Sequence, residues 1–417
     1  MLPRTLTSWI GLLLMGWLAL PVVAQHASPV APTETAGMSA ERLARIGPLM
    51  QAYVDDGHLA GIKMVVARRG KVVYYEDYGL RDIETGAPMT EDTIFRIYSM
   101  TKPITSVAVL MLYEEGRLRL NDPVARYIPA FATLQVYDAG AADGSMRTAQ
   151  RRPMTIRDLL THTSGLTYGF FSETPVDTLY RQTGLFAEGG NLENFIERLS
   201  DLPLLHQPGT TWHYSVSTDV LGYLVEAVSE QTLDVFFKER IFDPLGMTDT
   251  GFDVPPEKMD RFAVNYHKDD NGHLEAVDAG ATSQFAAPVR FFSGGGGLVS
   301  TAADYMRFAQ MLLGGGTLDG TRLLSPKTVE LMTANHLAED FAPGWGFGLG
   351  VQVCTDVART QMLGSEGTFG WSGMANTYFF IDPEEDLIAM VWTQFLPYGA
   401  YPISDQFKVA VYQAIVD

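Results

Sequence analysis

The spacing of apolar positions predicts strands towards both ends of the chain. Residues 62–67 and 72–78 are β-branched and aromatic runs, and the Arg69-Gly-Lys segment between them is typical of a hairpin turn. Runs of the same texture return late in the chain, at residues 347–353, 376–381 and 387–395. We therefore expect one sheet assembled from both ends of the chain.

Helical periodicity marks the segments before, between and after these strands. Ser39 reads as an N-cap, and the helix that it opens carries apolar residues on one side (Leu43, Ile46, Leu49, Met50 and Tyr53). Residues 131–153 show no period and are expected to form an excursion. Further helices are predicted at 155–162, 192–199, 218–229, 233–242, 301–313, 326–333 and 404–415.

These patterns divide the 417-residue chain into a signal peptide and two domains. Residues 25–98 and 291–417 are expected to form an α/β domain, and residues 99–290 a mainly helical inserted domain. Residues 1–24 are predicted to be a signal peptide, because Arg4 precedes an apolar run that is short for a membrane span and a small-residue cleavage site ends it. We expect export to a periplasm or the medium, without stable membrane insertion.

Composition narrows the classes of partner. The net charge of −19 disfavours nucleic acid and anionic lipid surfaces. Cys354 is the only cysteine, which excludes a disulfide framework and a lipid-attachment thiol near the predicted cleavage site. The oligomeric state stays open.

Ser99 and Lys102 form the first candidate catalytic pair. Residues at i and i+3 share one face of a helical turn, and a 3₁₀ lead-in brings their side chains closer still. Pro103 is tolerated only in a first turn, so it places the helix start near Ser99. A lysine that burial holds partly neutral can accept the proton of a neighbouring hydroxyl. The pair is therefore a candidate nucleophile with its activator.

Two later motifs add to this pair. Tyr214 lies in a loop that follows a Gln-Pro-Gly turn and precedes a predicted helix, so its phenol can reach a cleft and act as a general base. Trp371-Ser372-Gly373 leads into a predicted strand, and the glycine permits the close backbone approach that an oxyanion site needs.

The three motifs, in this order, resemble those of the serine β-lactamase and penicillin-binding-protein superfamily. The likeness is greatest to the class C β-lactamases and their carboxylesterase relatives, the family VIII esterases. The flanking segments 159–166, 244–252, 297–304 and 344–350 resemble the same branch. This resemblance implies a β-lactamase/DD-peptidase-like fold: an antiparallel sheet flanked by helices and built from both chain ends, with a helical lobe.

The resemblance also implies roles. Ser99 would be the acylated nucleophile, and Lys102 and Tyr214 would share the general base and acid roles. The backbone N–H groups of Ser99 and Met374 would form the oxyanion hole.

Two departures from the family bear on the substrate. Trp371 stands where β-lactamases and DD-peptidases carry a lysine that holds the substrate carboxylate, and Val216 stands where they carry an asparagine. A tryptophan offers an apolar wall, so esters fit better than anionic drugs. Other candidates for lining the pocket are Ser372, Gly373, Tyr168, Phe170, Phe171, Phe341 and Trp345.

The sequence gives less support to a metal site, an α/β-hydrolase active site or a phosphate-binding loop. His162, His206 and His213 lie in no metal-ligand pattern and are interpreted as structural, and no metal or cofactor is predicted. No Gly-x-Ser-x-Gly nucleophile elbow occurs. The Gly294–Gly297 run lacks the ending of a phosphate loop and is interpreted as a flexible turn before a helix.

The sequence therefore predicts a serine carboxylesterase acting on small to medium esters through an acyl-Ser99 intermediate. Four alternatives remain: a weak β-lactamase, a D-amino-acid peptidase, a transacylase, and a non-catalytic penicillin-recognition module.

Overall fold

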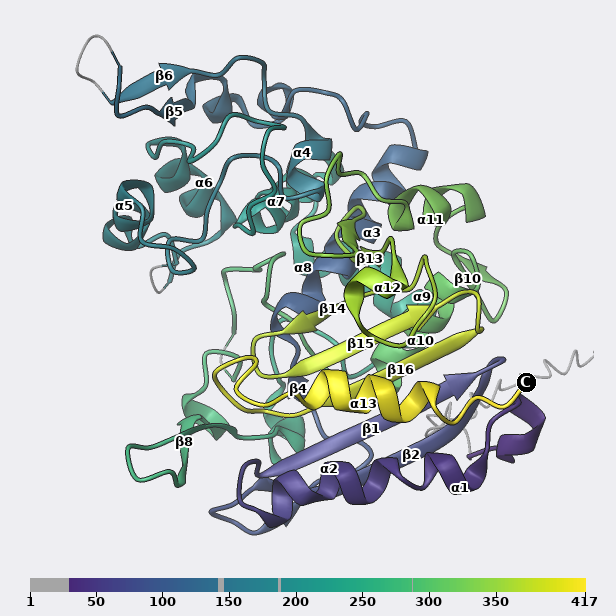
Figure 1. The fold of residues 1–417 in the computed structure, drawn as a ribbon. Helices are drawn as coiled ribbons and strands as arrows, with labels where there is room; N and C mark the ends of the chain where they lie inside the picture. Colours follow the sequence, from purple (N-terminus) through teal and green to yellow (C-terminus); the bar gives the residue numbers. More distant parts are fainter. Residues whose placement is uncertain (1–29, 142–145, 187–188, 287) are drawn as a thin grey trace, which may run out of the picture.

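The computed structural model describes residues 30–141, 146–186, 189–286 and 288–417 (Figure 1). The predicted signal peptide lies outside these residues. In the described part of the chain, no helix is both long and apolar enough to cross a membrane.

One eight-stranded antiparallel sheet organises the structure, in the order β12-β13-β14-β15-β16-β1-β2-β3. Its N-terminal and C-terminal halves meet where β1 pairs with β16, from Lys63 opposite Trp392 to Arg68 opposite Leu387. This confirms the expected sheet assembled from both chain ends. The strands are β1 (Gly61–Arg68), β2 (Lys71–Asp82), β3 (Ala87–Pro88), β12 (Trp345–Phe347), β13 (Gln352–Cys354), β14 (Phe369–Gly373), β15 (Thr377–Asp382) and β16 (Leu387–Trp392).

The predicted hairpin joins β1 to β2. Arg69 and Gly70 both have positive φ, 53° and 69°, as a two-residue turn matching the strand twist requires. Glycine adopts this backbone freely, and its presence at the second position explains why the turn forms here.

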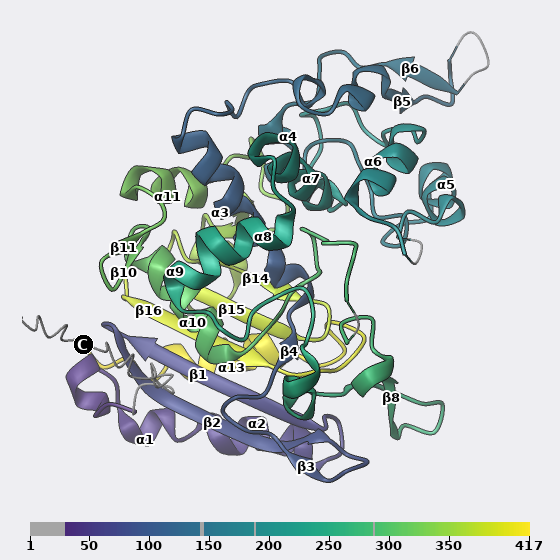
Figure 2. The ribbon, with the colours of Figure 1, turned by 180° about the vertical axis from the view of Figure 1, so that it is seen from behind.

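Helices cover both faces of the sheet. The helices α2 (Ile46–Asp55) and α13 (Ile403–Tyr412) lie on one face, and α10 (Ala302–Leu313) packs on the other (Figures 1 and 2). Every residue of β1 is buried, because alternate side chains enter two cores. Ile62 packs on the α2 side, whereas Val65 packs on the opposite side.

The single helix predicted after Ser39 is wrong in one respect. Ser39 caps α1 (Ala40–Leu43), accepting a hydrogen bond from Arg42 N, but α2 begins only at Ile46. Pro48 explains the break, since proline lacks an N–H and its ring clashes with the carbonyl four residues earlier. Leu49, expected on the apolar side, is 38% exposed.

The strand predicted at residues 347–353 is also wrong, because this stretch turns back on itself between β12 and β13. Gly350 has a φ of 89°, and a Cβ on Gly348 would lie 2.2 Å from the Met332 carbonyl oxygen. Only glycine fits such a turn, so the residues that read as one strand form a hairpin.

The middle of the chain is mainly helical, and two small hairpins, β5–β6 and β7–β8, interrupt it. The helix α5 was not anticipated from the sequence. The helices are α3 (Thr101–Glu114), α4 (Ile156–Leu160), α5 (Pro175–Thr183), α6 (Leu192–Ser200), α7 (Ser217–Ser229), α8 (Leu233–Phe237), the π-helix η5 (Lys238–Phe242) and α9 (Asp243–Leu245). The hairpin strands are β5 (Gln135–Tyr137), β6 (Arg147–Ala149), β7 (Asn265–Lys268) and β8 (Leu274–Asp278). After them come β9 (Val299–Ser300), β10 (Thr317–Leu318), β11 (Thr321–Arg322), α11 (Pro326–Thr333) and α12 (Val357–Thr360).

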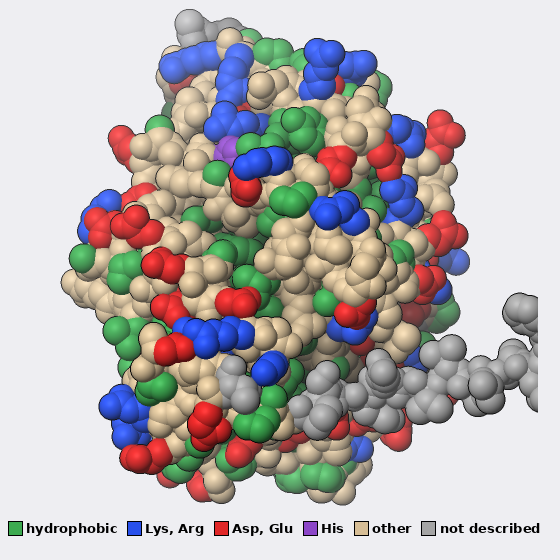
Figure 3. Space-filling view, turned by 90° about the vertical axis from the view of Figure 1, so that its right-hand side faces the viewer, with side chains coloured by type: hydrophobic (Ala, Val, Ile, Leu, Met, Phe, Trp, Pro, Cys, Tyr) green, Lys and Arg blue, Asp and Glu red, His purple; other side chains and the backbone are tan. Residues whose placement is uncertain are grey.

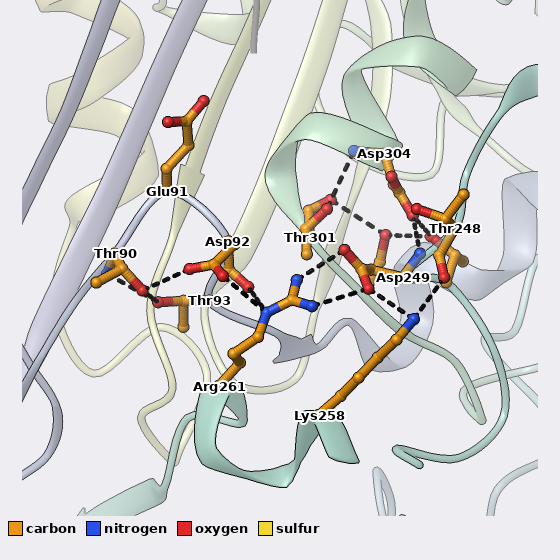
Figure 4. Close-up of polar contacts among 12 residues, drawn as sticks. Thr90, Glu91, Asp92, Thr93, Thr248, Asp249, Lys258, Arg261, Thr301 and Asp304 are labelled. Carbon is orange, nitrogen blue, oxygen red and sulfur yellow. Dashed lines mark hydrogen bonds and ion pairs between the residues drawn. The ribbon is translucent and has the colours of Figure 1, made fainter. Parts of the chain in front are cut away.

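An ion-pair network ties the loop after α9 to its neighbours (Figure 4). The carboxylate of Asp249 pairs with Arg261 at 2.7 Å and with Lys258 at 2.8 Å, and Arg261 also pairs with Asp92 at 2.9 Å. Asp304, at the start of α10, accepts the Asp249 N–H at 2.7 Å. The network braces the segment that leads from β9 into α10.

Charged side chains of both signs are interspersed on the face shown in Figure 3. Although the whole chain has a net charge of −19, its acidic side chains do not form a single acidic patch on this face.

Candidate active site

Ser99 lies on a short 3₁₀ turn, η2 (Tyr98–Met100), that runs directly into α3. The turn follows β4 (Phe95–Arg96), which pairs with β9. Tyr98 has a φ of 42°, a backbone conformation that a residue with a side chain rarely adopts. Such strain is typical of positions where the surrounding structure fixes a functional side chain. The helix start near Ser99 is thus confirmed, with Pro103 in the first turn.

Lys102 points its ammonium at Ser99. Its side chain is fully buried, and Nζ lies 3.0 Å from Ser99 Oγ and 2.6 Å from the carbonyl oxygen of Gly295. A buried ammonium needs such partners, because leaving it without hydrogen bonds is costly. The Gly295 carbonyl therefore fixes the position of the Lys102 ammonium group.

Tyr214 approaches from the loop before α7. Its hydroxyl donates a hydrogen bond to Ser99 Oγ at 2.7 Å, and the indole N–H of Trp371 donates to the Tyr214 oxygen at 3.4 Å. The ammonium of Lys102 lies 4.7 Å from the centre of the Tyr214 ring. The structure therefore brings Ser99, Lys102 and Tyr214 together around one oxygen.

The end of β14 comes close to the Ser99 turn at Gly373. A Cβ on Gly373 would lie 2.4 Å from the Ile97 carbonyl oxygen and 2.2 Å from Thr377 Oγ1. Only glycine permits this approach, as expected. Met374 follows directly, with an exposed side chain.

Aromatic rings surround Tyr214. The ring centres of Tyr168, Phe171 and Trp371 lie 5.2, 5.5 and 5.5 Å from that of Tyr214. Phe170 extends this group, with its ring 4.6 Å from that of Phe171. Phe170 and Phe171 are 55% and 59% exposed, so they leave an apolar surface open beside the site.

Two other predicted pocket residues, Phe341 and Trp345, are not in the group of rings around Tyr214. Phe341 stacks on Trp212 at 4.4 Å, and Trp212 in turn stacks near Tyr214, at 6.3 Å between ring centres. The ring of Trp345 instead lies 4.9 Å from the ammonium of Lys408, on α13.

The histidines are placed close to the site but pack as structural groups. His162 is buried with its ring 4.9 Å from that of Tyr214, and its Nδ1 lies 3.3 Å from Ser215 Oγ. Burial holds the pKa of His162 well below its usual range, so the ring is neutral. His206 and His213 face each other at 5.3 Å, and burial lowers the pKa of both. Among the described residues, no group of three or more His, Cys, Asp or Glu is arranged to hold a metal ion.

Two parts of the site were not predicted from the sequence: the Gly295 carbonyl and Asp219. The Gly294–Gly297 run does form a turn, but its Gly295 carbonyl holds Lys102, which the turn interpretation did not include. Asp219, on the first turn of α7, accepts the Gly295 N–H at 3.1 Å. In the sequence, only one feature pointed to a role for the Gly294–Gly297 run: it directly precedes residues 297–304, a segment that resembles the class C β-lactamase branch.

A family model described as Beta-lactamase matches residues 47–413. The chain belongs to the β-lactamase family. This confirms the resemblance drawn from the three motifs, and the eight-stranded sheet with flanking helices is the fold that the β-lactamase resemblance implied.

Individual relatives of this β-lactamase-family chain include esterases. An uncharacterised protein of Mycobacterium tuberculosis is 41% identical over 356 residues, covering 82% of this chain and 88% of the relative. Esterase EstB of Burkholderia gladioli is 34% identical over 410 residues, covering 93% and 99%. The solved structure of EstCE1, a hydrolase with promiscuous acyltransferase activity, matches with a TM-score of 0.78 at 30% identity, covering 89% of this chain and 99% of its own.

Proposed function

We propose that this protein is a serine carboxylesterase that acts through a covalent acyl-Ser99 intermediate. The observation that carries the proposal is the convergence on Ser99 Oγ of Lys102 Nζ at 3.0 Å and the Tyr214 hydroxyl at 2.7 Å. A nucleophile within hydrogen-bond reach of a base, itself oriented by a third group, is the arrangement of covalent catalysis. The similarity to esterase EstB over nearly the whole chain supports ester hydrolysis.

In acylation, Ser99 Oγ attacks the ester carbonyl carbon. Tyr214 acts as the base in its phenolate form, which the neighbouring Lys102 ammonium and the Trp371 N–H stabilise, and the Ser99 proton passes to the phenolate oxygen. The carbonyl π electrons move onto oxygen to give the tetrahedral intermediate. When the intermediate collapses, the C–O bond to the alcohol breaks and the alcohol leaves with the proton held by Tyr214.

The oxyanion would be held by the backbone N–H groups of Ser99 and Met374. The close approach of Gly373 to Ile97 supports this assignment, because it brings the end of β14 against the turn that carries Ser99. Two fixed N–H donors stabilise developing charge without reorganising, which makes them effective.

In deacylation, water replaces the alcohol. The Tyr214 phenolate, regenerated when the alcohol left and stabilised by the Lys102 ammonium, accepts a water proton as the water oxygen attacks the acyl carbonyl. When this second intermediate collapses, the bond to Ser99 Oγ breaks, Tyr214 returns the proton to Ser99, and the carboxylic acid is released. An alcohol or thiol in place of water would give acyl transfer. The promiscuous acyltransferase activity of EstCE1 makes transfer the second candidate.

The substrate class follows from the aromatic surroundings of Tyr214. Trp371 occupies the position of the carboxylate-holding lysine of β-lactamases, and Phe170 and Phe171 extend the apolar surface outwards. We assign uncharged esters with apolar acyl or alcohol groups as the substrates, because such groups gain from burial against aromatic rings.

A substrate panel tests this assignment. Hydrolysis of p-nitrophenyl esters from acetate to palmitate is measured beside nitrocefin and a D-alanyl-D-alanine peptide, with Ser99→Ala as the control. We expect ester turnover that is lost in Ser99→Ala, with nitrocefin and the peptide at least about 10³-fold slower in kcat/KM. Comparable rates on nitrocefin or the peptide would instead assign the β-lactamase or D-amino-acid peptidase alternative. Added alcohol that diverts product from acid to ester would assign transfer.

A covalent probe separates catalysis from mere recognition. A fluorophosphonate should add one adduct per chain by intact mass, located on Ser99 by peptide mapping and absent in Ser99→Ala. A folded wild-type protein that forms no adduct would contradict the esterase proposal and favour a non-catalytic recognition module.

We also propose that the protein is exported after removal of residues 1–24. The charged start, short apolar run and small-residue site support this. Expression of the full chain in a Gram-negative host should give periplasmic protein whose first residue by mass spectrometry is Gln25. An intact N-terminus in the cytosolic fraction would contradict it.

A further inference from the structure

Asp219 is a buried carboxylate near Lys102 that the proposed mechanism does not use. It lies on the first turn of α7 and is 1% exposed. The hydroxyl of Ser293 donates to its Oδ1, and the Gly295 N–H donates to the same oxygen at 3.1 Å. A carboxylate this deeply buried is costly unless its hydrogen bonds are made, so its presence calls for a reason.

The residue Gly295 joins this carboxylate to the catalytic lysine. Its N–H points to Asp219, while its carbonyl oxygen accepts from Lys102 Nζ at 2.6 Å. The neighbouring Gly294 carbonyl accepts the Thr105 hydroxyl at 2.7 Å. The glycine turn is therefore held between α7 and α3: the Gly295 N–H is directed to α7, and the carbonyls of Gly294 and Gly295 are directed to α3.

The fit between Asp219 and the turn is tight. A Cβ on Gly295 would lie 2.5 Å from Asp219 Oδ2, and a Cβ on Gly294 would lie 2.6 Å from the Thr218 carbonyl oxygen. The carboxylate thus packs directly on the backbone of the glycine turn.

Electrostatics favours the same arrangement. Burial raises the pKa of Asp219, while the Ser293 hydroxyl, the Lys102 ammonium and the Gly295 N–H all act to lower it. These three groups favour the charged carboxylate, and a negative charge near a buried ammonium stabilises both ions.

We propose that Asp219 is a positioning residue that orients Gly295 so that its carbonyl holds the Lys102 ammonium against Ser99. The inference rests on the proposed function, because Lys102 matters only if Ser99 is acylated. Asp219 acts through Gly295 and touches no reacting atom.

The test compares Asp219→Ala, Asp219→Asn and Ser293→Ala by steady-state kinetics on p-nitrophenyl butyrate and by the rate of fluorophosphonate labelling of Ser99. Asp219→Ala removes both hydrogen bonds and should lower kcat and the labelling rate on the order of 10- to 100-fold, with KM within about 3-fold. Asp219→Asn keeps an acceptor at Oδ1, so its kcat and labelling rate should be at least about 3-fold higher than those of Asp219→Ala. Ser293→Ala removes one bond to the carboxylate and should lower kcat about 3- to 10-fold.

Asp304→Asn is the matched control. Asp304 is also a buried carboxylate on the first turn of a helix, but its partners are Asp249 and Thr250 rather than the catalytic turn. Its kcat should stay within about 2-fold of wild type even if the melting temperature changes, which separates positioning from a general loss of stability.

Two results would overturn the inference. A folded Asp219→Ala with kcat within about 3-fold of wild type would do so, as would an Asn variant no better than the Ala variant. Should Asp219→Ala fail to fold, Ser293→Ala decides, and an unchanged kcat in that variant counts against the inference. Failure of the proposed function looks different, since wild type itself would then neither label nor hydrolyse esters.

Discussion

The hydroxyl of Tyr214 lies 2.7 Å from Ser99 Oγ although the two residues are 115 positions apart in the chain. Ser99 sits at the start of α3, and Tyr214 sits just before α7, which packs against α3. The contact therefore exists only when the segment before α7 is docked on α3, the helix whose leading turn lies beside β14. Activity consequently reports on the packing of α3 and α7 as well as on the two side chains.

Replacing Lys102 by methionine should abolish most activity while the protein stays folded. Methionine fills the volume of the apolar stem but cannot bond Ser99 Oγ or the Gly295 carbonyl. We expect kcat on p-nitrophenyl butyrate to fall about 10²- to 10⁴-fold, the range for losing a general acid or base. Circular dichroism and thermal melting check the fold.

Lys63→Met provides the control for burying methionine in place of lysine. Lys63 is equally buried but pairs with Asp77 on the far strand of the N-terminal hairpin. Breaking this pair should cost about 3 to 5 kcal/mol of stability and leave kcat unchanged. Near wild-type turnover in Lys102→Met would contradict the proposed mechanism.

Phe171→Ala should change selectivity for the length of the acyl chain. The ring is 59% exposed and borders Tyr214, so its loss removes apolar surface from the substrate without emptying the core. With about 0.8 kcal/mol for each buried methylene, kcat/KM for p-nitrophenyl hexanoate should fall about 10-fold. The acetate ester should change by less than about 3-fold.

Leu179→Ala, an exposed apolar residue on α5, should leave both esters unaffected. Equal losses on acetate and hexanoate in Phe171→Ala would show that the ring supports the general structure of the site and does not bind the acyl chain.

Local patterns were sufficient to predict much of the fold. The runs at 62–67 and 72–78 appear within β1 and β2, because alternation and turn residues act over a few positions. The break at Pro48 and the turn at Gly348 and Gly350 also have local causes, and the predictions there failed because apolar residues outweighed the glycines and the proline.

Asp219 could not have been predicted in this way. Its partner Gly295 lies 76 positions further along the chain, and no spacing rule joins a carboxylate on one helix to a backbone N–H in a distant turn. Ser99 and Lys102 were found because they are three residues apart, whereas the group that holds the lysine becomes visible only through tertiary contacts.

Gly373→Ala should lower activity by displacing the end of β14. The added Cβ would meet the Ile97 carbonyl and Thr377 Oγ1, so the strand must move away from the Ser99 turn. A shift of this kind costs on the order of 10²-fold in kcat. Gly251→Ala is the control, because its Cβ would lie 3.7 Å from the nearest atom. Activity of Gly373→Ala within about 3-fold of wild type would argue against a role for this approach.

Asp304 should make stability depend on pH in the acidic range. Burial raises the pKa of Asp304 to about 6, against which the N–H of Asp249, the Thr250 hydroxyl and Lys258 act, while the Asp249 charge adds to it. The unfolded chain has an ordinary aspartate pKa near 3.8. Between these values the folded protein binds the proton more tightly, so stability falls as pH rises from about 4 to about 6. The loss amounts to about 3 kcal/mol at most.

The amide in Asp304→Asn cannot titrate, so this part of the pH dependence should disappear. Urea unfolding at pH 4.5 and at pH 7.5 measures this effect. Between the lower and the higher pH, the unfolding free energy of the variant should rise by about 2 kcal/mol relative to that of wild type. Glu257→Gln, an exposed carboxylate on the neighbouring turn at residues 256–261, should keep the wild-type difference. The same pH dependence in Asp304→Asn and wild type would mean that the carboxylate is charged in the folded protein throughout this range, held so by its bonds to Asp249 and Thr250.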